Sequence, residues 1–302
     1  MSTELRERLS KLKRQRNAII LVHNYQRPEV QDVADFVGDS LGLSQQAAKT
    51  KADVILFCGV HFMAETAAIL CPDKTVLMPD ENAGCPMANM VTVRELREKK
   101  KQNPNAVVVC YVNTTAAVKA ESDICCTSAN APKVVASVPP DKPVLFIPDK
   151  SLGQYCARKV KRDFIFWEGY CPTHHRILAE DILRRKAEAP NAQVVVHPEC
   201  TSDVIDLADH VASTTGILNY CRQSPHNEFI IGTEMGILHR LAKESPRKHF
   251  IHAAKLADCP NMKLNTLEKM VWSLEDMTYR VTVPPGIASK ARQAIERMLA
   301  LS

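Results

Sequence analysis

Three Cys-Pro pairs recur at almost equal spacing along the chain, and this spacing is the feature that most limits how the chain can fold. Cys85-Pro86, Cys171-Pro172 and Cys259-Pro260 lie 86 and 88 residues apart, each where a strand-like run meets a helix-like run. A period of this length is too long for a solenoid repeat and suits a small α/β domain. A unit repeated three times would bring one thiol from each copy to a common pseudo-threefold axis.

Other features recur at nearly the same spacing, with 88 residues from the first copy to the second and 86 from the second to the third. An aspartate recurs in each copy, a hydroxyl follows five residues later, and a short apolar run that ends in a polar triplet precedes both. The aspartates are Asp35, Asp123 and Asp209, the hydroxyls are Ser40, Ser128 and Thr214, and the triplets are His23-Asn24-Tyr25, Tyr111-Val112-Asn113 and His197-Pro198-Glu199. Agreement between several features indicates a true internal repeat.

Each copy is predicted to run helix, strand, helix, strand, helix, strand before its Cys-Pro pair. In the second copy the strands are expected at 107–110, 144–147 and 164–167, with helices at about 93–101 and 152–159. Short runs that are apolar on both faces and separated by helices are typical of a parallel sheet covered on both sides. We therefore predict an α/β fold of three pseudo-threefold-related αβα domains, each with a short parallel sheet, around a central cavity.

The repeat also predicts domain limits. The three copies are expected at 1–89, 90–176 and 177–275, and a tail at 276–302 is expected to dock back onto the first domain. In the tail, 279–283 is predicted as a strand, Pro284-Pro285-Gly286 as a turn and 287–301 as an amphipathic helix.

Composition narrows the class of protein. Eleven cysteines without an export signal predict free thiols and a cytoplasmic location, because disulfides belong to oxidising compartments. No run approaches the length of apolar sequence that a membrane span needs. The net charge of +5 is not gathered into arginine-rich or aromatic-basic segments, so neither nucleic acid nor a membrane is an expected partner. This moderate positive charge favours binding of a small anionic substrate.

The three Cys-Pro thiols predict a metal centre. Zinc sites usually take cysteines in close pairs such as Cys-x-x-Cys, and the sequence contains none. Iron–sulfur cubanes usually use four thiolates, so three would leave one iron open to act as a Lewis acid. We therefore expect Cys85, Cys171 and Cys259 to hold a cluster. The alternative is that they are small buried residues at tight turns. The other cysteines, such as Cys58, Cys110 and Cys156, are read as packing residues.

The triplets predict an acid–base set beside this centre. Alternate residues of a strand face the same way, so His23 with Tyr25, Tyr111 with Asn113, and His197 with Glu199 are expected to face the cavity. Ligands in open parallel sheets bind beyond the carboxyl ends of the strands, where all six residues fall. The hydroxyls of Ser40, Ser128 and Thr214 stand at expected helix starts, where they either bind an anion or cap the helix.

These motifs resemble the quinolinate synthase family, the iron–sulfur enzymes of NAD biosynthesis, over essentially the whole chain. The segments that carry the resemblance are His23-Asn24-Tyr25-Gln26, Ala34-Asp35 to Ser40, Tyr111-Val112-Asn113-Thr114, Thr127-Ser128-Ala129-Asn130, His197-Pro198-Glu199-Cys200, Gly232-Thr233-Glu234 and Cys259-Pro260-Asn261-Met262-Lys263. The resemblance implies three αβα domains around a [4Fe-4S] cluster with three cysteine ligands and one open iron.

It also implies the reaction, in which iminoaspartate condenses with dihydroxyacetone phosphate to give quinolinate, phosphate and two waters. Tyr25 and Glu199 would then handle proton transfers, Tyr111, His23 and His197 would orient intermediates, and the open iron would bind the diacid intermediate and product. Ser40, Ser128 and Thr214, together with Asn113, would hold polar and anionic groups of the substrates. An aspartate-oxidising enzyme would be the transient partner that supplies the imine.

Two other classes of protein fit an open iron or a cluster. A hydro-lyase of the aconitase type also uses an open iron, and release of phosphate from the substrate distinguishes the two reactions. A non-catalytic cluster-bearing sensor is the second alternative, although it would have little use for six convergent acid–base side chains.

Overall fold

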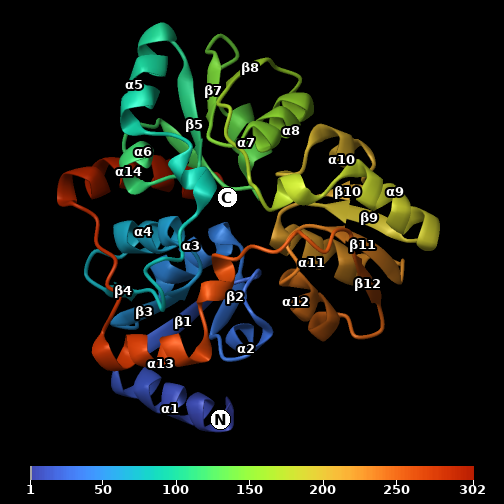
Figure 1. The fold of residues 1–302 in the computed structure, drawn as a ribbon. Coiled ribbons are helices and arrows are strands. Elements are labelled where there is room, and N and C mark those ends of the chain that lie inside the picture. Colours follow the sequence, from blue (N-terminus) through green and yellow to red (C-terminus); the bar gives the residue numbers. More distant parts are fainter. Residues whose placement is uncertain (1) are drawn as a thin grey trace.

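The computed structural model describes residues 2–302, and three separate four-stranded parallel sheets form its framework. Figure 1 shows one lobe for each sheet, arranged around a common centre. Every strand pairing within the sheets is parallel, and helices cover the sheet faces. The predicted α/β class with three αβα units is therefore confirmed.

The three sheets share one strand order, in which the second strand of each unit lies at one edge and the first lies beside it. The orders are β2-β1-β3-β4, β6-β5-β7-β8 and β10-β9-β11-β12. The strands are β1 (Ala18–His23), β2 (Phe36–Gly38), β3 (Val54–Cys58), β4 (Thr75–Leu77), β5 (Val107–Tyr111), β6 (Ile124–Cys126), β7 (Val144–Ile147), β8 (Phe164–Phe166), β9 (Gln193–Val196), β10 (His210–Val211), β11 (Glu228–Gly232) and β12 (His249–His252).

Helices connect the strands, and several of them begin at capping side chains. Thr92 and Glu95 form a reciprocal capping box at α5, and Asp149 accepts from Leu152 N at α8. The helices are α1 (Ser2–Gln15), α2 (Pro28–Gln31), α3 (Ser40–Lys49), α4 (His61–Leu70), α5 (Val93–Gln102), α6 (Ala116–Lys119), α7 (Ala131–Ala136), α8 (Lys150–Val160), α9 (Ala179–Glu188), α10 (Ser202–Asp206), α11 (Thr214–Gln223), α12 (Ile237–Glu244), α13 (Leu267–Asp276) and α14 (Pro285–Ala300). No helix within residues 2–302 is both long and apolar enough to cross a bilayer.

The predicted number of strands was one too few in each unit. The missed strands are the edge strands β2, β6 and β10, which are only two or three residues long. Such short segments carry too few residues to show a period in the sequence. The strands expected in the second copy are present as β5, β7 and β8.

The repeated aspartates have a structural role at these edge strands. Asp35 accepts a hydrogen bond from Ile20 N at 2.8 Å, Asp123 from Val108 N at 2.8 Å and Asp209 from Val194 N at 2.8 Å. In each unit the aspartate's own N–H donates to the carbonyl of the same partner residue. The aspartate therefore fastens the start of each edge strand to the first half of the neighbouring strand.

The predicted strand at 279–283 is wrong. Residues 279–281 exchange three backbone hydrogen bonds with 76–78, but they form only a single antiparallel bridge, between Arg280 and Leu77. Pro284 and Pro285 follow directly and cannot donate to a ladder, which limits the pairing.

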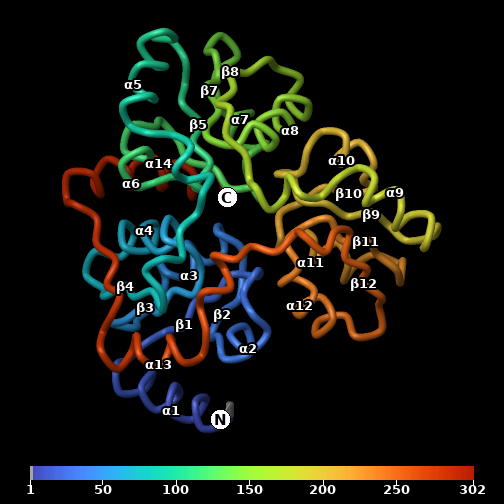
Figure 2. The backbone as a smooth tube through the Cα atoms, in the orientation of Figure 1, coloured from blue at the N-terminus to red at the C-terminus, as the bar shows by residue number. Residues whose placement is uncertain are grey.

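The C-terminal segments link the lobes. Figure 2 shows the chain passing from the third lobe back to the first after β12. There α13 packs against α1 and β3, with Leu267, Met270 and Val271 in the core of the first sheet. Further on, α14 contacts α4 of the first lobe and also α6 and β6 of the second. We keep the limits 89, 176 and 275 as a proposal about the sequence repeat; in space, α13 belongs with the first sheet.

Candidate active site

The carboxyl ends of the strands in all three sheets surround one cavity of about 150 Å³. Every residue that the sequence proposes for the site lies in its lining. These residues are His23, Tyr25, Ser40, Cys85, Tyr111, Asn113, Ser128, Cys171, His197, Glu199, Thr214 and Cys259. The repeat therefore brings its polar positions to one place, as expected for parallel strands.

Cys85, Cys171 and Cys259 are distinct from the other cysteines. All eleven are free thiols, and these three are partly exposed whereas the remaining eight are buried. Single turns of 3₁₀ helix follow or lie close to them, at Pro86–Asn89, His174–Arg176 and Met262–Leu264, in place of the expected longer helices. Burial raises the pKa of Cys85 to about 12, while the N–H groups of Ala88 and Met87 act in the opposite direction.

The spacing of these thiols bears on the kind of metal centre. Within residues 2–302, the one group of metal-binding atoms that all lie within 4.8 Å of one another is formed by Cys171, His174 and Glu199. The three Cys-Pro thiols form no such group, so one ion cannot join them without movement. They share a cavity, however, which suits a centre several ångströms across. Burial raises the pKa of Cys171 and of Cys259, and nearby backbone N–H groups act in the opposite direction.

His23 and His197 occupy equivalent positions and have the same tautomer. His23 Nδ1 accepts from Tyr25 N at 3.2 Å, and His197 Nδ1 accepts from Glu199 N at 3.3 Å. Burial lowers the pKa of His23 to about 4 and that of His197 to about 3, so both are neutral near pH 7. The proton must then be on Nε2, and His197 Nε2 donates to Ser128 Oγ at 3.1 Å.

Glu199 is buried among groups that stabilise its charge. Burial opposes ionisation of this carboxyl, but His174, His197 and the Tyr111 hydroxyl outweigh it and lower the pKa of Glu199. Tyr111 donates a short hydrogen bond to Glu199 Oε1, and His174 Nδ1 lies 2.7 Å from Oε2. Burial and the nearby Glu199 raise the pKa of Tyr111, so its phenol stays protonated.

Tyr25 belongs to the same network through His174. Its hydroxyl lies 2.5 Å from Thr233 Oγ1 and 3.3 Å from His174 Nε2, while Thr233 Oγ1 lies 2.9 Å from the same nitrogen. Burial, with Glu199 next, raises the pKa of Tyr25. Both phenols of the cavity are therefore proton donors at neutral pH.

The three hydroxyls are not the helix caps. Asp39 caps α3 and Ser213 caps α11, so Ser40 and Thr214 are the first residues inside their helices. Thr214 Oγ1 accepts from Asn24 Nδ2 at 2.7 Å, which leaves its own proton for another acceptor. Ser128 precedes α7, where Asn130 Oδ1 accepts from Thr127 N. Asn113 Oδ1 is buried and has no hydrogen-bond partner in the structure.

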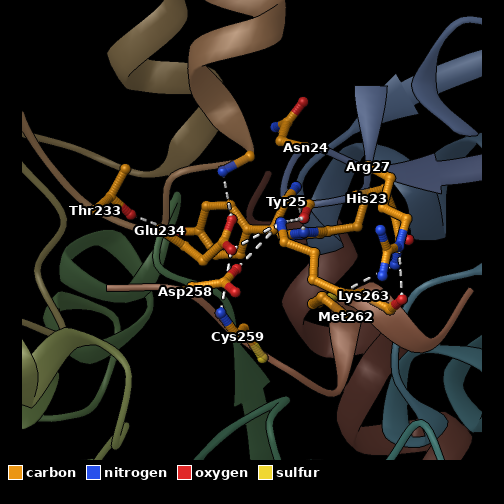
Figure 3. A network of polar contacts seen from close by, with 12 residues as sticks. His23, Asn24, Tyr25, Arg27, Thr233, Glu234, Asp258, Cys259, Met262 and Lys263 are labelled. Atoms are coloured by element: carbon orange, nitrogen blue, oxygen red, sulfur yellow. Dashed lines mark hydrogen bonds and ion pairs between the residues drawn. The ribbon is translucent and has the colours of Figure 1, made fainter. Parts of the chain in front are cut away.

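An ion pair beside the cavity fastens Cys259 to the strand end that carries Tyr25 (Figure 3). Glu234 Oε1 lies 2.8 Å from Lys263 Nζ and accepts from Cys259 N at 3.1 Å, and its other oxygen accepts from Gly236 N at 2.7 Å. Lys263 also donates to Tyr25 O. Burial raises the pKa of Glu234 to about 7, against the opposing effect of Lys263. A Cβ on Gly236 would stand 2.5 Å from Tyr25 O, so this contact between the first and third lobes requires glycine.

Sequence reasoning missed His174, and it did not assign a role to Glu234 or Lys263. The available signals were the Cys-x-x-His spacing from Cys171 to His174 and the position of Glu234 just after the strand β11. His174 is 1% exposed and connects Cys171, Glu199, Tyr25 and Thr233. It is therefore central to the polar network.

Comparisons with known proteins cover nearly the whole chain. Residues 7–300 match the model of a family described as "Quinolinate synthetase A protein". The chain is 57% identical over 298 residues to a quinolinate synthase of Methanosarcina barkeri, which spans 99% of this chain and 98% of that protein. It is 56% identical over 298 residues to one of Geotalea uraniireducens, with the same coverage, and 57% identical over 301 residues to one of Desulforudis audaxviator, covering 100% and 99%.

Proposed function

The chain belongs to the quinolinate synthetase A family of enzymes, and from this premise we propose the reaction that its cavity carries out. Iminoaspartate condenses with dihydroxyacetone phosphate to give quinolinate, one phosphate and two waters, a balance that needs neither oxidant nor reductant. The observation that carries the proposal is the convergence of two phenols, two neutral imidazoles, one ionised carboxylate and three partly exposed thiols on one cavity.

We propose that Cys85, Cys171 and Cys259 hold a [4Fe-4S] cluster with one open iron. The support is their shared cavity and their partial exposure, which distinguishes them from the eight buried cysteines. When bound, such a cluster supplies a Lewis acid for a carboxylate or nitrogen of the diacid. The remaining chemistry falls to the side chains of the chain.

The hydroxyls and helix starts are proposed to bind the anionic groups. Ser40 and Thr214 each begin a ten-residue helix, where free N–H groups and the helix dipole favour an anion. Ser128 accepts from His197 Nε2, so its own proton can point to a phosphate oxygen. Among the described residues that line the cavity, Arg176 is the one arginine or lysine. Neutral donors therefore make most of the proposed contacts to the anionic groups of the substrates.

Glu199 is proposed as the proton acceptor and Tyr25 as a donor. An ionised carboxylate can take protons from the carbon and nitrogen atoms that lose them during condensation. A phenol kept protonated by burial can donate to a leaving hydroxyl. Tyr111, His23 and His197 are proposed to orient intermediates, because each is a neutral polar group in the cavity lining that a neighbouring group holds in place.

The test is anaerobic reconstitution of the full chain with iron and sulfide, followed by incubation with both proposed substrates. Quinolinate and phosphate should appear in equal amounts. Dehydration of a hydroxy acid without release of phosphate would instead support the hydro-lyase alternative. A loaded protein that releases neither product would contradict the proposed reaction.

Two further proposals concern the surroundings of the enzyme. The eleven free cysteines support a cytoplasmic, reducing location. An aspartate-oxidising enzyme is proposed as the source of the imine, because iminoaspartate hydrolyses in water and must be used soon after it forms.

A further inference from the structure

One group of side chains in the cavity has the composition of a site for a single metal ion. Cys171 and His174 lie three residues apart in one loop, Glu199 follows β9, and their potential ligand atoms lie within 4.8 Å of one another. His174 Nδ1 lies 2.7 Å from Glu199 Oε2 and 3.1 Å from Cys171 Sγ. The side chains of His174 and Glu199 are only 2% and 4% exposed. Three donors of different types therefore converge, two of them almost fully buried, which makes the group a candidate site for a cation.

Neighbouring hydrogen bonds orient each donor. His174 Nε2 lies 2.9 Å from Thr233 Oγ1, so the other ring nitrogen points to Cys171 and Glu199. Tyr111 occupies Glu199 Oε1, which leaves Oε2 for a further contact. Outer contacts of this kind fix the tautomer and direction of a metal-binding histidine.

The geometry fits a small ion with modest movement. Bonds of about 2.0 to 2.3 Å in a tetrahedral site place ligand atoms roughly 3.4 to 3.6 Å apart. His174 Nδ1 would therefore move away from Glu199 Oε2 and from Cys171 Sγ by less than about 1 Å as an ion enters. All three residues line the cavity, which supplies a fourth position for water. A thiolate, an imidazole and one carboxylate favour zinc-like ions over magnesium or calcium.

We propose that, when the chain lacks its cluster, Cys171, His174 and Glu199 bind one divalent ion of the zinc class. On binding, the Cys171 thiol and His174 Nδ1, which donates to the Glu199 carboxylate 2.7 Å away, each release one proton to the solvent. Because Cys171 is shared, this ion and the proposed cluster exclude each other. Zinc then blocks cluster loading from within the site, whereas the cluster, once loaded, prevents the ion from binding.

The probe is Co²⁺, added anaerobically to the full-length protein after iron has been removed. One equivalent should produce the thiolate-to-cobalt charge-transfer band, Zn²⁺ should abolish it by displacement, and an excess of Mg²⁺ should not. Cys171→Ser should lose the band, and His174→Ala and Glu199→Gln should each bind Co²⁺ at least about tenfold more weakly, because each loses a ligand.

The matched control is Cys85→Ala, which removes a proposed cluster ligand but no member of the group. It should keep the Co²⁺ band and lose cluster loading. Loss of the band in Cys85→Ala, or unchanged affinity in His174→Ala, would overturn the proposal. Circular dichroism checks that each variant is folded, and His174→Gln replaces His174→Ala if the latter is not.

Two experiments, iron and sulfide loading in the presence of Zn²⁺ and the Co²⁺ titration, separate this proposal from the proposed function. Wild-type protein loaded with Zn²⁺ should take up iron and sulfide at least about tenfold more slowly than metal-free protein, and His174→Ala should show little such difference. Equal loading with and without Zn²⁺ would refute the exclusion. The Co²⁺ titration needs no substrate or cluster, so its result stands even if the condensation reaction is not found.

Discussion

The two ends of the first strand in each lobe have kept the threefold repeat to different degrees. At the outer end, Asp35, Asp123 and Asp209 are the same residue and make the same 2.8 Å hydrogen bond. At the cavity end, the equivalent pairs are His23 with Tyr25, Tyr111 with Asn113, and His197 with Glu199. The scaffold uses the same hydrogen bond three times, because each short edge strand must be attached to its neighbouring strand in the same way. The cavity needs different groups, since a reaction on an asymmetric substrate requires an acid, a base and several donors at separate points.

The cysteines are the exception, since they face the cavity and have stayed identical. A symmetric centre accounts for this, because each lobe would supply an equivalent ligand. The comparison therefore predicts two roles for the residues that are identical in all three lobes: the aspartates support the fold, and the cysteines hold a symmetric metal centre. The residues that differ between the lobes are predicted to carry out the chemistry.

The largest effect is expected at the cysteines. Cys85→Ser, Cys171→Ser or Cys259→Ser should abolish or severely weaken iron and sulfide binding and reduce turnover to background, because three ligands are the fewest that fit the proposed centre. Iron and sulfide analysis of anaerobically reconstituted protein measures this. The buried Cys221→Ser is the control and should load normally. A fourth cysteine that proved equally necessary would remove the open iron from the proposal.

The next largest effect, on kcat, is expected at Glu199, a position where the three lobes carry different residues. Glu199→Gln should keep the cluster and the fold while kcat falls by about a hundredfold or more, the scale for loss of a positioned acid or base. The steady-state rate of quinolinate formation, divided by cluster content, is the measurement. Glu228→Gln, on the outer face beside His249, should retain full activity. Near-normal turnover in a loaded Glu199→Gln protein would place the chemistry elsewhere in the cavity.

Ser128→Ala should have a moderate effect on substrate binding. The change removes the proposed hydrogen bond to the phosphate, so KM for dihydroxyacetone phosphate should rise by about tenfold, equivalent to about 1.4 kcal/mol. The visible spectrum of the cluster should not change. Ser137→Ala, at the end of α7, is the matched control because the Ser137 hydroxyl donates to the helix carbonyl of Val134 and lies outside the cavity lining. Unchanged KM in Ser128→Ala would move the phosphate to Ser40 or Thr214.

The smallest catalytic effect is expected at the repeated aspartates. Asp123→Ala should lower the free energy of unfolding by about 1 to 3 kcal/mol, because it leaves the part-buried Val108 N–H without its acceptor. The turnover of the folded, loaded enzyme should be unchanged. Urea denaturation and activity per cluster measure the two quantities. If Asp123→Ala instead lowers turnover as much as Glu199→Gln does, the division between scaffold and site is wrong.

Much of the site could be predicted because the repeat and the strand period act together. The apolar runs end at His23, Tyr111 and His197, and parallel strands place such ends on one side. Every predicted site residue consequently lines one cavity. The edge strands β2, β6 and β10 could not be found in this way, because two or three residues pair only when a longer strand lies beside them.

The sequence by itself determined the threefold repeat, the parallel α/β class and the residue types that meet at the centre, because these depend on spacing along the chain. Only the tertiary structure decided which groups touch. His174 reaches Glu199 across 25 residues of chain, and Lys263 pairs with Glu234 while holding the backbone of Tyr25. Burial and these neighbours then keep His23 and His197 neutral, Glu199 ionised and both phenols protonated. Protonation states depend on desolvation and on nearby charges, and both are properties of the folded chain alone.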